Sequence, residues 1–501
     1  WAAHAVHHQS QDYNLSTALR QTSSGALLGW VFYVPMALAG VPPLVFGVVA
    51  LIDLLYQFWV HTEQVGRLSW FDRWFCSPSN HRVHHAVNDA YLDKNYGGIL
   101  ILWDRIFGTF KDEDDKEKCV YGTRGLLNSW DPLWANAQVY AGLAHDSWHT
   151  RRWGDKLRVW LKPPGWRPAD VAQRFPKPAF DIARMPRYNP AMTPATRWFA
   201  SVQFVLLLAG VSVFLWHADS APLAHNTAWF AALLATQWAL GAVVQGRISM
   251  PLALMIEAGA LATATSAVGW TEWHLVFKPL TMVIAIILVA ACALSISARG
   301  RFYAKPWVTM VLALVLSLAG DVFLMLHGLF IPGLVSFLGA HLAYIALFRL
   351  GVPWFARRGA LVATLAVGTA MYAFLWAGGL PAALRGPVAA YVLVIALMAA
   401  QALGRARALG TSAARMVAVG ACLFMVSDSL LATSRFVQPL PMAQFWVLST
   451  YYAAQVLIVW GWLREPVSAP ADAAPRVDAP EGMQATHALL DHRRAVPNRP
   501  V

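Results

Sequence analysis

The chain has 501 residues, of which 57% are hydrophobic and only 13% are charged. Soluble globular proteins contain about 25% charged residues, so this composition excludes a disordered chain, a coiled coil and an ordinary cytosolic enzyme. It indicates a membrane protein with many spans. The formal net charge of +12 is typical of cytoplasmic loops in such proteins, and we therefore predict no binding of nucleic acid.

The first 198 residues contain two polar blocks, 1–24 and 61–198, on either side of an apolar stretch. The chain begins at Trp1 with no Met and no signal peptide, and a His-rich motif follows at once, so we expect a fragment that lacks its natural N-terminus. Residues 25–60 are apolar but are interrupted near Pro42, which predicts two short spans or a re-entrant hairpin. Residues 61–198 carry charged runs such as 111–118 and predict a domain that faces water.

Apolar segments of helical length recur along the rest of the chain. They lie near residues 199–217, 228–246, 251–267, 275–297, 306–326, 329–348, 354–377, 386–404, 414–433 and 444–463. Each is close to the length of a membrane crossing, and none shows the alternation typical of strands. We predict an all-α, polytopic integral membrane protein with domains at 1–198, 199–267 and 268–464. The third domain is a bundle of seven to eight helices, and the tail 465–501 is expected to be disordered.

Basic residues alternate between successive loops of the last bundle. The loops 298–305, 349–358 and 405–415 each hold three Arg or Lys residues, whereas the loops between them hold one or none. By the positive-inside rule, residues 268–274 lie outside, and both the C-terminal tail and residues 61–198 lie inside. We expect a protein of a bacterial inner membrane.

Histidines cluster near the start of the chain. Two segments share one spacing, His4-x-x-His7-His8 and His81-x-x-His84-His85, and His61 ends an apolar helix before the second segment. On a helix this spacing puts the imidazoles on one face, so two facing segments can hold two metal ions. The ligands alone fit iron, copper, nickel or zinc. We interpret His217 and His274 as structural and leave His145 and His149 unassigned.

Two segments carry a resemblance to a known family. Residues 3–21 (AHAVHHQSQDYNLSTALRQ) and 58–110 (from FWVHTEQVGRLSW to DRIFGTF) resemble the fatty acid hydroxylase/sterol desaturase superfamily, most closely its alkylglycerol monooxygenase branch. The resemblance implies a membrane-embedded di-iron oxygenase with O2 as co-substrate and membrane lipids as substrates. It also implies an electron donor or pterin, tetrahydrobiopterin in that branch. The iron ligands that it implies are His4, His7, His8, His61, His81, His84 and His85.

One part of that family's pattern is missing. The family has a further HxxxH box, followed by Glu, a few residues before the first HxxHH segment, and here that region would precede Trp1. We therefore expect the site in this chain to be incomplete and its oxygenase step to be lost or much weakened.

The last bundle has few polar residues inside its apolar segments. Ionisable groups in a membrane are functional candidates by default, and here two of them are aspartates. The segments KPLTM, GDVFLML, LFMVSDSLLAT and STYYAAQVLIVWGW resemble the YhhN family, which includes lysoplasmalogenases that hydrolyse vinyl ethers. The resemblance implies Asp321 and Asp428 as the acid/base pair. Around them it implies Lys278, His341, Tyr451, Tyr452 and Gln455.

The two resemblances together predict a two-part enzyme of ether-lipid breakdown. One part oxidises alkyl ethers or acyl chains, the other hydrolyses vinyl ethers, and the loop charges place their sites on opposite membrane faces. In the alternative interpretation, the first part is a sterol or fatty acid hydroxylase and the bundle is a lipid-binding or transporter-like partner.

Overall fold

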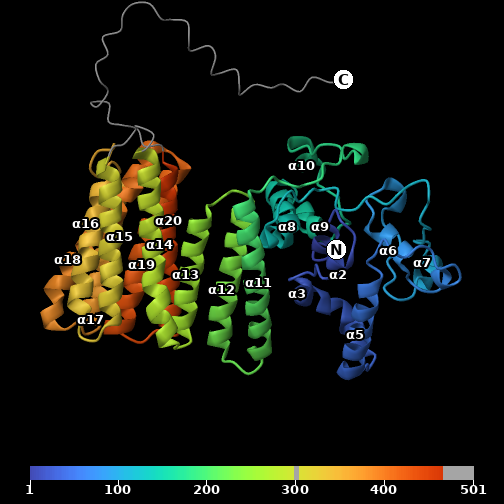
Figure 1. Cartoon of the computed structure of the whole chain (residues 1–501), viewed down its shortest axis with the longest axis horizontal. Coiled ribbons are helices and arrows are strands. Elements are labelled where there is room, and N and C mark those ends of the chain that lie inside the picture. Colours follow the sequence, from blue (N-terminus) through green and yellow to red (C-terminus); the bar gives the residue numbers. More distant parts are fainter. Residues whose placement is uncertain (298–303, 466–501) are drawn as a thin grey trace, which may run out of the picture. The chain divides into compact units, whose positions relative to one another are not determined.

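The computed structural model describes residues 1–297 and 304–465, so most of the tail expected to be disordered lies outside the described residues. Among these residues every regular element is a helix (Figure 1), and only two isolated β-bridges occur. Nine of the described helices are long and apolar enough to cross a membrane, which confirms the predicted all-α polytopic class. The chain forms two compact units, Trp1–Phe277 and a second that starts at Lys278.

Short helices form the start of the first unit. They are α1 (Ala5–His8), α2 (Leu15–Ala18), α3 (Gly25–Gly29), the 3-10 helix η1 (Trp30–Tyr33), α4 (Val34–Leu38) and α5 (Pro43–Trp59). Pro42 is extended and Pro43 occupies the first turn of α5, where the missing N–H of a proline is not needed. No residue of the 17-residue α5 is buried. Its apolar side chains therefore remain available to lipid.

The polar block 61–198 contains short and medium helices. They are η2 (Phe71–Arg73), α6 (Pro78–His85), η3 (Asp89–Tyr91), α7 (Leu102–Phe107), α8 (Pro132–His149), α9 (Trp153–Leu161), α10 (Ala169–Arg174) and η4 (Ile182–Arg184). The side chain of Ser77 caps α6 by accepting from the N–H of Asn80, and Pro78 lies in its first turn. These residues fix where α6 starts and so set the direction of its three histidines.

Three apolar helices complete the first unit, α11 (Pro194–His217), α12 (Leu223–Val244) and α13 (Met250–Ala267). The end of α12 packs against the start of α8. A Cβ atom on Gly241 would lie only 3.0 Å from Asp131 Cα, and just beyond α12 Gln245 Nε2 donates to Ser129 Oγ at 2.9 Å. This close approach joins the polar block to the apolar helices.

Seven helices build the second unit within the described residues. They are α14 (Thr271–Ser297, from Lys278 on), α15 (Ala304–Met325), α16 (Phe330–Phe348), α17 (Arg358–Ala377), α18 (Ala382–Leu409), α19 (Ser412–Phe436) and α20 (Ala443–Arg464). The predicted span at 444–463 forms α20, which is long enough to cross but is not among the nine helices that are also apolar enough.

Glycines bring α19 and α20 close together. A Cβ atom on Gly420 would lie 2.8 Å from the carbonyl oxygen of Ala454, and one on Gly461 would lie 2.8 Å from that of Ala413. Small residues permit such close approach of helices in membranes. The contact fixes α20, which carries Tyr451, against α19, which carries Asp428.

Candidate functional site

The seven predicted iron ligands lie together in the first unit, and we call them the histidine cluster. α1 with the residue before it supplies three of them, the chain after α5 supplies His61, and α6 supplies the other three. They form two groups, each with ligand atoms within 4.8 Å of one another. The first group is His7, His61, His81 and His85; the second is His4, His8 and His84.

Imidazole nitrogens converge in the first group. His61 Nε2 lies 3.0 Å from His7 Nε2, 3.1 Å from His81 Nε2 and 3.2 Å from His85 Nε2. All four side chains are buried, and His61 is only 1% exposed. A single proton on His61 could serve one of these three contacts, so hydrogen bonding does not account for the arrangement.

Backbone carbonyls set the tautomers of two members. His61 Nδ1 lies 2.6 Å from the carbonyl oxygen of Gln57, and His7 Nδ1 lies 3.1 Å from that of Arg20. A carbonyl only accepts, so each Nδ1 is the protonated nitrogen and each Nε2 carries a lone pair. Two lone pairs 3.0 Å apart repel each other unless a cation lies beside them, and metal-bound histidines use the same second hydrogen bond for orientation.

Burial keeps the imidazoles neutral. It lowers the pKa of His61 to about 4, although the hydrogen bond to Gln57 opposes this shift. Burial and the neighbouring imidazoles lower the pKa of His81 and His85 well below 6.5. Neutral imidazole is the form that binds metal ions, so the cluster is in its ligand form near pH 7.

The second group is more open to solvent. His4 is exposed and His8 and His84 are half-buried. His84 Nδ1 lies 3.3 Å from the carbonyl oxygen of Lys94, which orients its Nε2 as in the first group. The ring centroids of His8 and His84 are 4.8 Å apart. The two groups therefore fit one enclosed and one more accessible metal position.

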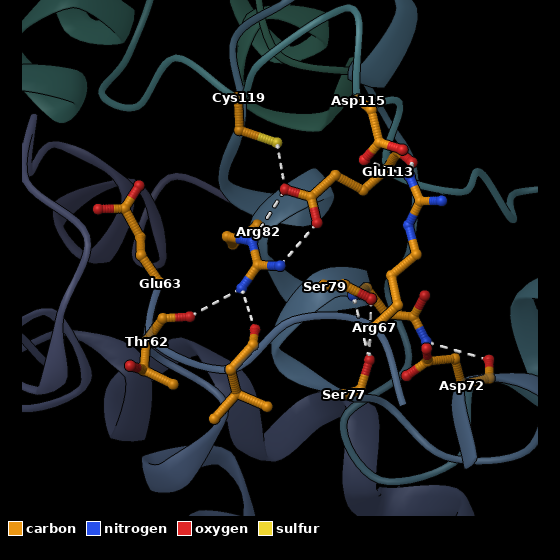
Figure 2. Close-up of polar contacts among 12 residues, drawn as sticks. Thr62, Glu63, Arg67, Asp72, Ser77, Ser79, Arg82, Glu113, Asp115 and Cys119 are labelled. Atoms are coloured by element: carbon orange, nitrogen blue, oxygen red, sulfur yellow. Dashed lines mark hydrogen bonds and ion pairs between the residues drawn. The ribbon is translucent and has the colours of Figure 1, made fainter. Parts of the chain in front are cut away.

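Arg82 holds the loops around the cluster in place (Figure 2). Its Nε and Nη2 donate to the two carboxylate oxygens of Glu113 at 2.9 and 2.7 Å, and its Nη1 donates to the carbonyl oxygens of Thr62 and Val65. Cys119 Sγ contacts Glu113 as well. Because Thr62 follows His61 and Arg82 follows His81, this buried guanidinium fixes the distance between two ligand segments. Arg82 was not predicted as a site residue, although it lies between the histidines of the second segment.

An apolar cleft leads to the histidine cluster, and we call it the alkyl cleft. It has a volume of about 910 Å³. Its apolar wall comes from α4 and α5, with residues such as Met36, Phe46 and Ala50, and it ends at His4, His7 and His61. A lipid chain in this cleft would bring a carbon next to the cluster.

A second polar site lies in the bundle of the second unit. Asp321 on α15 accepts a hydrogen bond of 2.6 Å from the Tyr451 hydroxyl, and its other oxygen lies 3.5 Å from Lys278 Nζ. Gln455 contacts the Tyr451 oxygen, and the Tyr344 hydroxyl donates to Gln455 at 2.7 Å. Asp321 is 2% exposed, so this network compensates for burial of the carboxylate.

Asp428 on α19 has a different set of partners. The Tyr391 hydroxyl donates to it at 2.5 Å, and His341 Nε2 lies 3.6 Å from the same carboxylate oxygen. His341 also contacts the Tyr391 hydroxyl at 2.9 Å and is completely buried. No basic residue other than this histidine pairs with Asp428 among the described residues.

Both carboxylates line one cavity of about 230 Å³, which we call the aspartate cavity. Of the seven residues predicted for this site, Lys278, Asp321, Asp428 and Tyr451 line it. His341 and Gln455 lie behind Tyr391 and Tyr451, respectively, and contact them by hydrogen bonds. Tyr452 is buried beside Tyr451, with ring centroids 5.0 Å apart, and is not a lining residue. Tyr391 and Tyr344 were not predicted.

Comparison with known proteins identifies both parts. A family model described as fatty acid hydroxylase matches residues 1–109, and the YhhN family model matches residues 273–462. The chain combines a fatty acid hydroxylase domain with a YhhN domain. No solved structure matches the chain significantly.

Named relatives exist for each domain. The chain is 42% identical over 216 residues to alkylglycerol monooxygenase of Danio rerio, a match that covers 42% of this chain and 46% of that protein. It is 39% identical over 210 residues to alkylglycerol monooxygenase of Homo sapiens, with the same coverage. It is 38% identical over 155 residues to lysoplasmalogenase TMEM86B of Homo sapiens, covering 31% of this chain and 63% of that protein. The chain therefore spans about half the length of the alkylglycerol monooxygenases.

The buried cluster in the fatty acid hydroxylase domain is consistent with an iron site. Its donors are neutral imidazoles with lone pairs aimed at one another, and such donors suit iron as well as copper, nickel and zinc. Two further histidines of the first unit lie elsewhere. His145 and His149 stack on α8 with ring centroids 4.2 Å apart, and neither is part of a metal-type group among the described residues.

One buried acid in the apolar helices of the first unit was also missed. Glu257 on α13 accepts a hydrogen bond of 2.7 Å from Gln203 on α11 and is 7% exposed. It is the only acidic residue of the apolar segment 251–267, and that isolation was the signal that could have found it.

Proposed function

We propose that the fatty acid hydroxylase domain is a di-iron oxygenase that hydroxylates lipid chains. The contacts of 3.0–3.2 Å between imidazole Nε2 atoms carry this proposal. The histidine cluster would hold two irons, which supply reductive activation of O2. The chain's own residues orient the ligands through backbone carbonyls, and Arg82 fixes the spacing between ligand segments.

An ether lipid is the substrate that the relatives favour. Alkylglycerol monooxygenases of Xenopus tropicalis and Danio rerio are similar to 42% of this chain, and the alkyl cleft supplies an apolar wall that ends at His7 and His61. One oxygen atom of O2 enters the carbon beside the ether oxygen and the other leaves as water. Tetrahydrobiopterin or another donor supplies the two electrons. The resulting hemiacetal collapses to an aldehyde and an alcohol.

For the YhhN domain we propose hydrolysis of the vinyl ether of a lysoplasmalogen in the aspartate cavity. The two carboxylates that share this cavity with different partners support it. Lys278 places a positive charge beside Asp321, which suits a carboxylate that activates water. Asp428 lacks such a cation among its described partners and has a side chain that is 20% exposed, which suits a proton donor.

The proposed steps balance without a metal or oxidant. Asp428 protonates the enol ether at the carbon remote from oxygen, which leaves an oxocarbenium ion. Asp321 takes a proton from water as the water oxygen attacks that ion. As the hemiacetal breaks down, Asp321 gives its proton to the glycerol oxygen and Asp428 takes the proton of the hemiacetal hydroxyl. The products are a fatty aldehyde and the glycerophospho alcohol, and both carboxyl groups return to their starting states. Tyr451 and Tyr391 hold the two carboxylates in place through their hydrogen bonds.

Together these activities would degrade two kinds of ether lipid to the same product class, fatty aldehyde. Loop charges favour an inner membrane location with the histidine cluster on the cytoplasmic side. The test is to incubate the purified protein with 1-O-alkylglycerol, O2 and tetrahydrobiopterin, and separately with a lysoplasmalogen under argon. We expect aldehyde from the lysoplasmalogen with this chain, and aldehyde from the alkylglycerol when the HxxxH segment expected before His4 is also present.

Other outcomes distinguish the alternatives. Oxidation of fatty acids or sterols, with no aldehyde from alkylglycerol, would replace the first assignment by an acyl or sterol hydroxylase. Binding of the lysoplasmalogen without any hydrolysis would replace the second by a lipid-binding or transporter-like role.

A further inference from the structure

Arg435 lies at the end of the aspartate cavity that is remote from Asp428 along α19. It belongs to the last turn of α19 (Ser412–Phe436) and is both exposed and a lining residue of the cavity. Its guanidinium carbon lies 4.1 Å from the ring centroid of Phe330 and 5.9 Å from that of Phe436. These rings hold the plane of the guanidinium and leave its N–H groups at the edge available.

The guanidinium has no anionic partner in the described part of the chain. The other cation of the cavity, Lys278, pairs with Asp321, and Arg405 elsewhere in the unit pairs with Glu465. No ion pair or hydrogen bond involves the Arg435 side chain within residues 278–297 and 304–465. A lining guanidinium with free donors, beside two aromatic rings, is a site for an anion.

The sequence spacing relates this site to the proposed chemistry. Arg435 follows Asp428 by seven residues on one helix, so both lie on the same face of α19. The rise over seven residues is about 10 Å. Ala432 and Leu431, between them, also line the cavity. The guanidinium and the carboxylate therefore lie at two ends of one continuous surface.

We propose that Arg435 binds the phosphate of a lysolipid headgroup and so places the vinyl ether at Asp428. This inference rests on the proposed hydrolase function of the YhhN domain. In a lysoplasmalogen, the carbon that Asp428 would protonate and the phosphorus are joined through the glycerol by seven bonds of about 1.5 Å, which span roughly 8–9 Å when extended. An arginine side chain on a helix points toward the N-terminus of that helix, which shortens the gap from Arg435 toward Asp428.

This assignment predicts selectivity for phosphate-bearing substrates. Arginine binds phosphate through two parallel N–H donors, so a neutral 1-alkenylglycerol would lose that contact. The lining residues Leu324, Phe337 and Met371 give the cavity an apolar surface that suits the alkenyl chain. Arg435 is thus a specificity-determining residue that contacts the headgroup and takes no part in proton transfer.

The test compares the turnover of two substrates by the Arg435→Gln variant and by the wild-type protein. One substrate is a 1-alkenyl lysophospholipid and the other is the matching 1-alkenylglycerol without phosphate. For Arg435→Gln we expect kcat/KM on the phosphate-bearing substrate to fall roughly tenfold to a hundredfold, with turnover of the neutral substrate unchanged. Arg435→Lys should retain part of the activity, because it keeps the charge and loses the two-donor geometry.

Arg385→Gln is the matched control. Arg385 also stacks on a ring, that of Trp376 at 4.0 Å, but it is not a lining residue of the aspartate cavity. This variant should change neither substrate. An equal loss on both substrates in Arg435→Gln would make Arg435 a structural residue and overturn the proposal, and so would full activity on the phosphate-bearing lipid.

A third arm separates the lipid headgroup from a free anion. Inorganic phosphate is added to the wild-type enzyme and to Arg435→Gln. Inhibition of the wild type that is lost in the variant, with lipid kcat/KM unchanged between them, would assign the site to free phosphate and overturn headgroup binding. Absence of all hydrolysis in the wild type, on either substrate, would instead overturn the proposed hydrolase.

Discussion

Tyr451 on α20 donates a hydrogen bond of 2.6 Å to Asp321 on α15, although 130 positions separate the two residues. The same carboxylate lies 3.5 Å from Lys278 on α14. Three helices therefore meet at one buried carboxylate, which faces the aspartate cavity. The phenol and the ammonium hold Asp321 in one orientation, as a group that activates water requires.

This contact leads to the first prediction. Asp321→Asn should lower the rate of lysoplasmalogen hydrolysis by roughly 100-fold or more, because general acid–base groups contribute factors of this size. Tyr451→Phe removes only the hydrogen bond and should lower the rate by about tenfold. Tyr372→Phe is the control, since Tyr372 bonds to the carbonyl oxygen of Arg385 and does not line the cavity. Aldehyde release from detergent-solubilised protein measures all three, and near wild-type turnover in Asp321→Asn would reduce this carboxylate to a packing role.

The second prediction concerns metal binding. His61 contacts three other imidazoles of its group, so His61→Ala should remove iron from the first group of ligands and reduce the total iron content. His145→Ala should retain the wild-type iron content, because His145 lies outside both groups. Metal analysis of the purified proteins measures this without an activity assay. Equal iron in both variants would show that the histidine cluster does not bind it.

Sequence patterns predicted the helical class and the grouping of the histidines, for a physical reason. The apolar segments indicate membrane helices directly, because a helix needs about 20 apolar residues to cross a bilayer. The i, i+3, i+4 spacing of His81, His84 and His85 likewise fixes one face of one helix. Such a pattern depends only on residues that are close in the chain, so it can be recognised without knowledge of the tertiary structure.

Contacts between distant segments were not predictable in the same way. Tyr391 and Tyr344 are ordinary apolar-helix tyrosines in sequence. Only the packing of α18 against α19 and of α16 against α20 shows that they bond to Asp428 and Gln455, respectively. Arg82 looked like a surface residue of a polar segment, yet it is 7% exposed and bound to Glu113. Such roles depend on which segments pack against each other, and these contacts cannot be predicted from a single sequence.

The third prediction tests a buried ion pair in the polar block. Burial raises the pKa of Asp146, but hydrogen bonds from Arg167 and His145 outweigh it, so the folded pKa is below the usual value. A carboxyl with a lowered folded pKa stabilises the protein above its unfolded pKa of about 3.9. This stabilisation is lost as the pH falls through the folded pKa.

Arg167→Gln should therefore lower the free energy of unfolding by about 1–3 kcal/mol at pH 7, and the difference from wild type should shrink below about pH 4. Arg184→Gln is the control, because Arg184 is 88% exposed in its pair with Asp181 and such pairs contribute about 0–1 kcal/mol. Thermal unfolding followed at several pH values measures both. A difference that stays constant from pH 7 to pH 3 would contradict the assigned ion pair.

The fourth prediction concerns the alkyl cleft. Ala50 lines the cleft, whereas Val48 on the same helix is 48% exposed and does not line it. Ala50→Phe should fill part of the cleft and reduce oxidation of long alkyl chains more than of short ones. Val48→Phe adds a ring outside the cleft and should leave the chain-length preference unchanged. Oxidation rates measured over a series of alkylglycerols of different chain length would show this preference. An equal loss of rate at every chain length in Ala50→Phe would argue against binding of the chain in the alkyl cleft.

The last prediction concerns the side of the membrane that each loop of the first unit faces. Three membrane-type helices, α11, α12 and α13, separate the polar block from residues 268–274, so an odd number of crossings puts these two regions on opposite sides. Basic residues then place the polar block inside. Glu113 is a poor labelling position, because it is bound to Arg82. Lys116 and Trp273 are both exposed and serve better.

Lys116→Cys and Trp273→Cys are made separately in protein whose four free native cysteines have been replaced. On intact cells, a membrane-impermeant thiol reagent should label position 273 and leave position 116 unlabelled. After the cells are permeabilised, both positions should react, which confirms that each cysteine is accessible in the folded protein. Labelling of position 116 on intact cells, with position 273 protected, would reverse the orientation and place the histidine cluster on the outer side of the membrane.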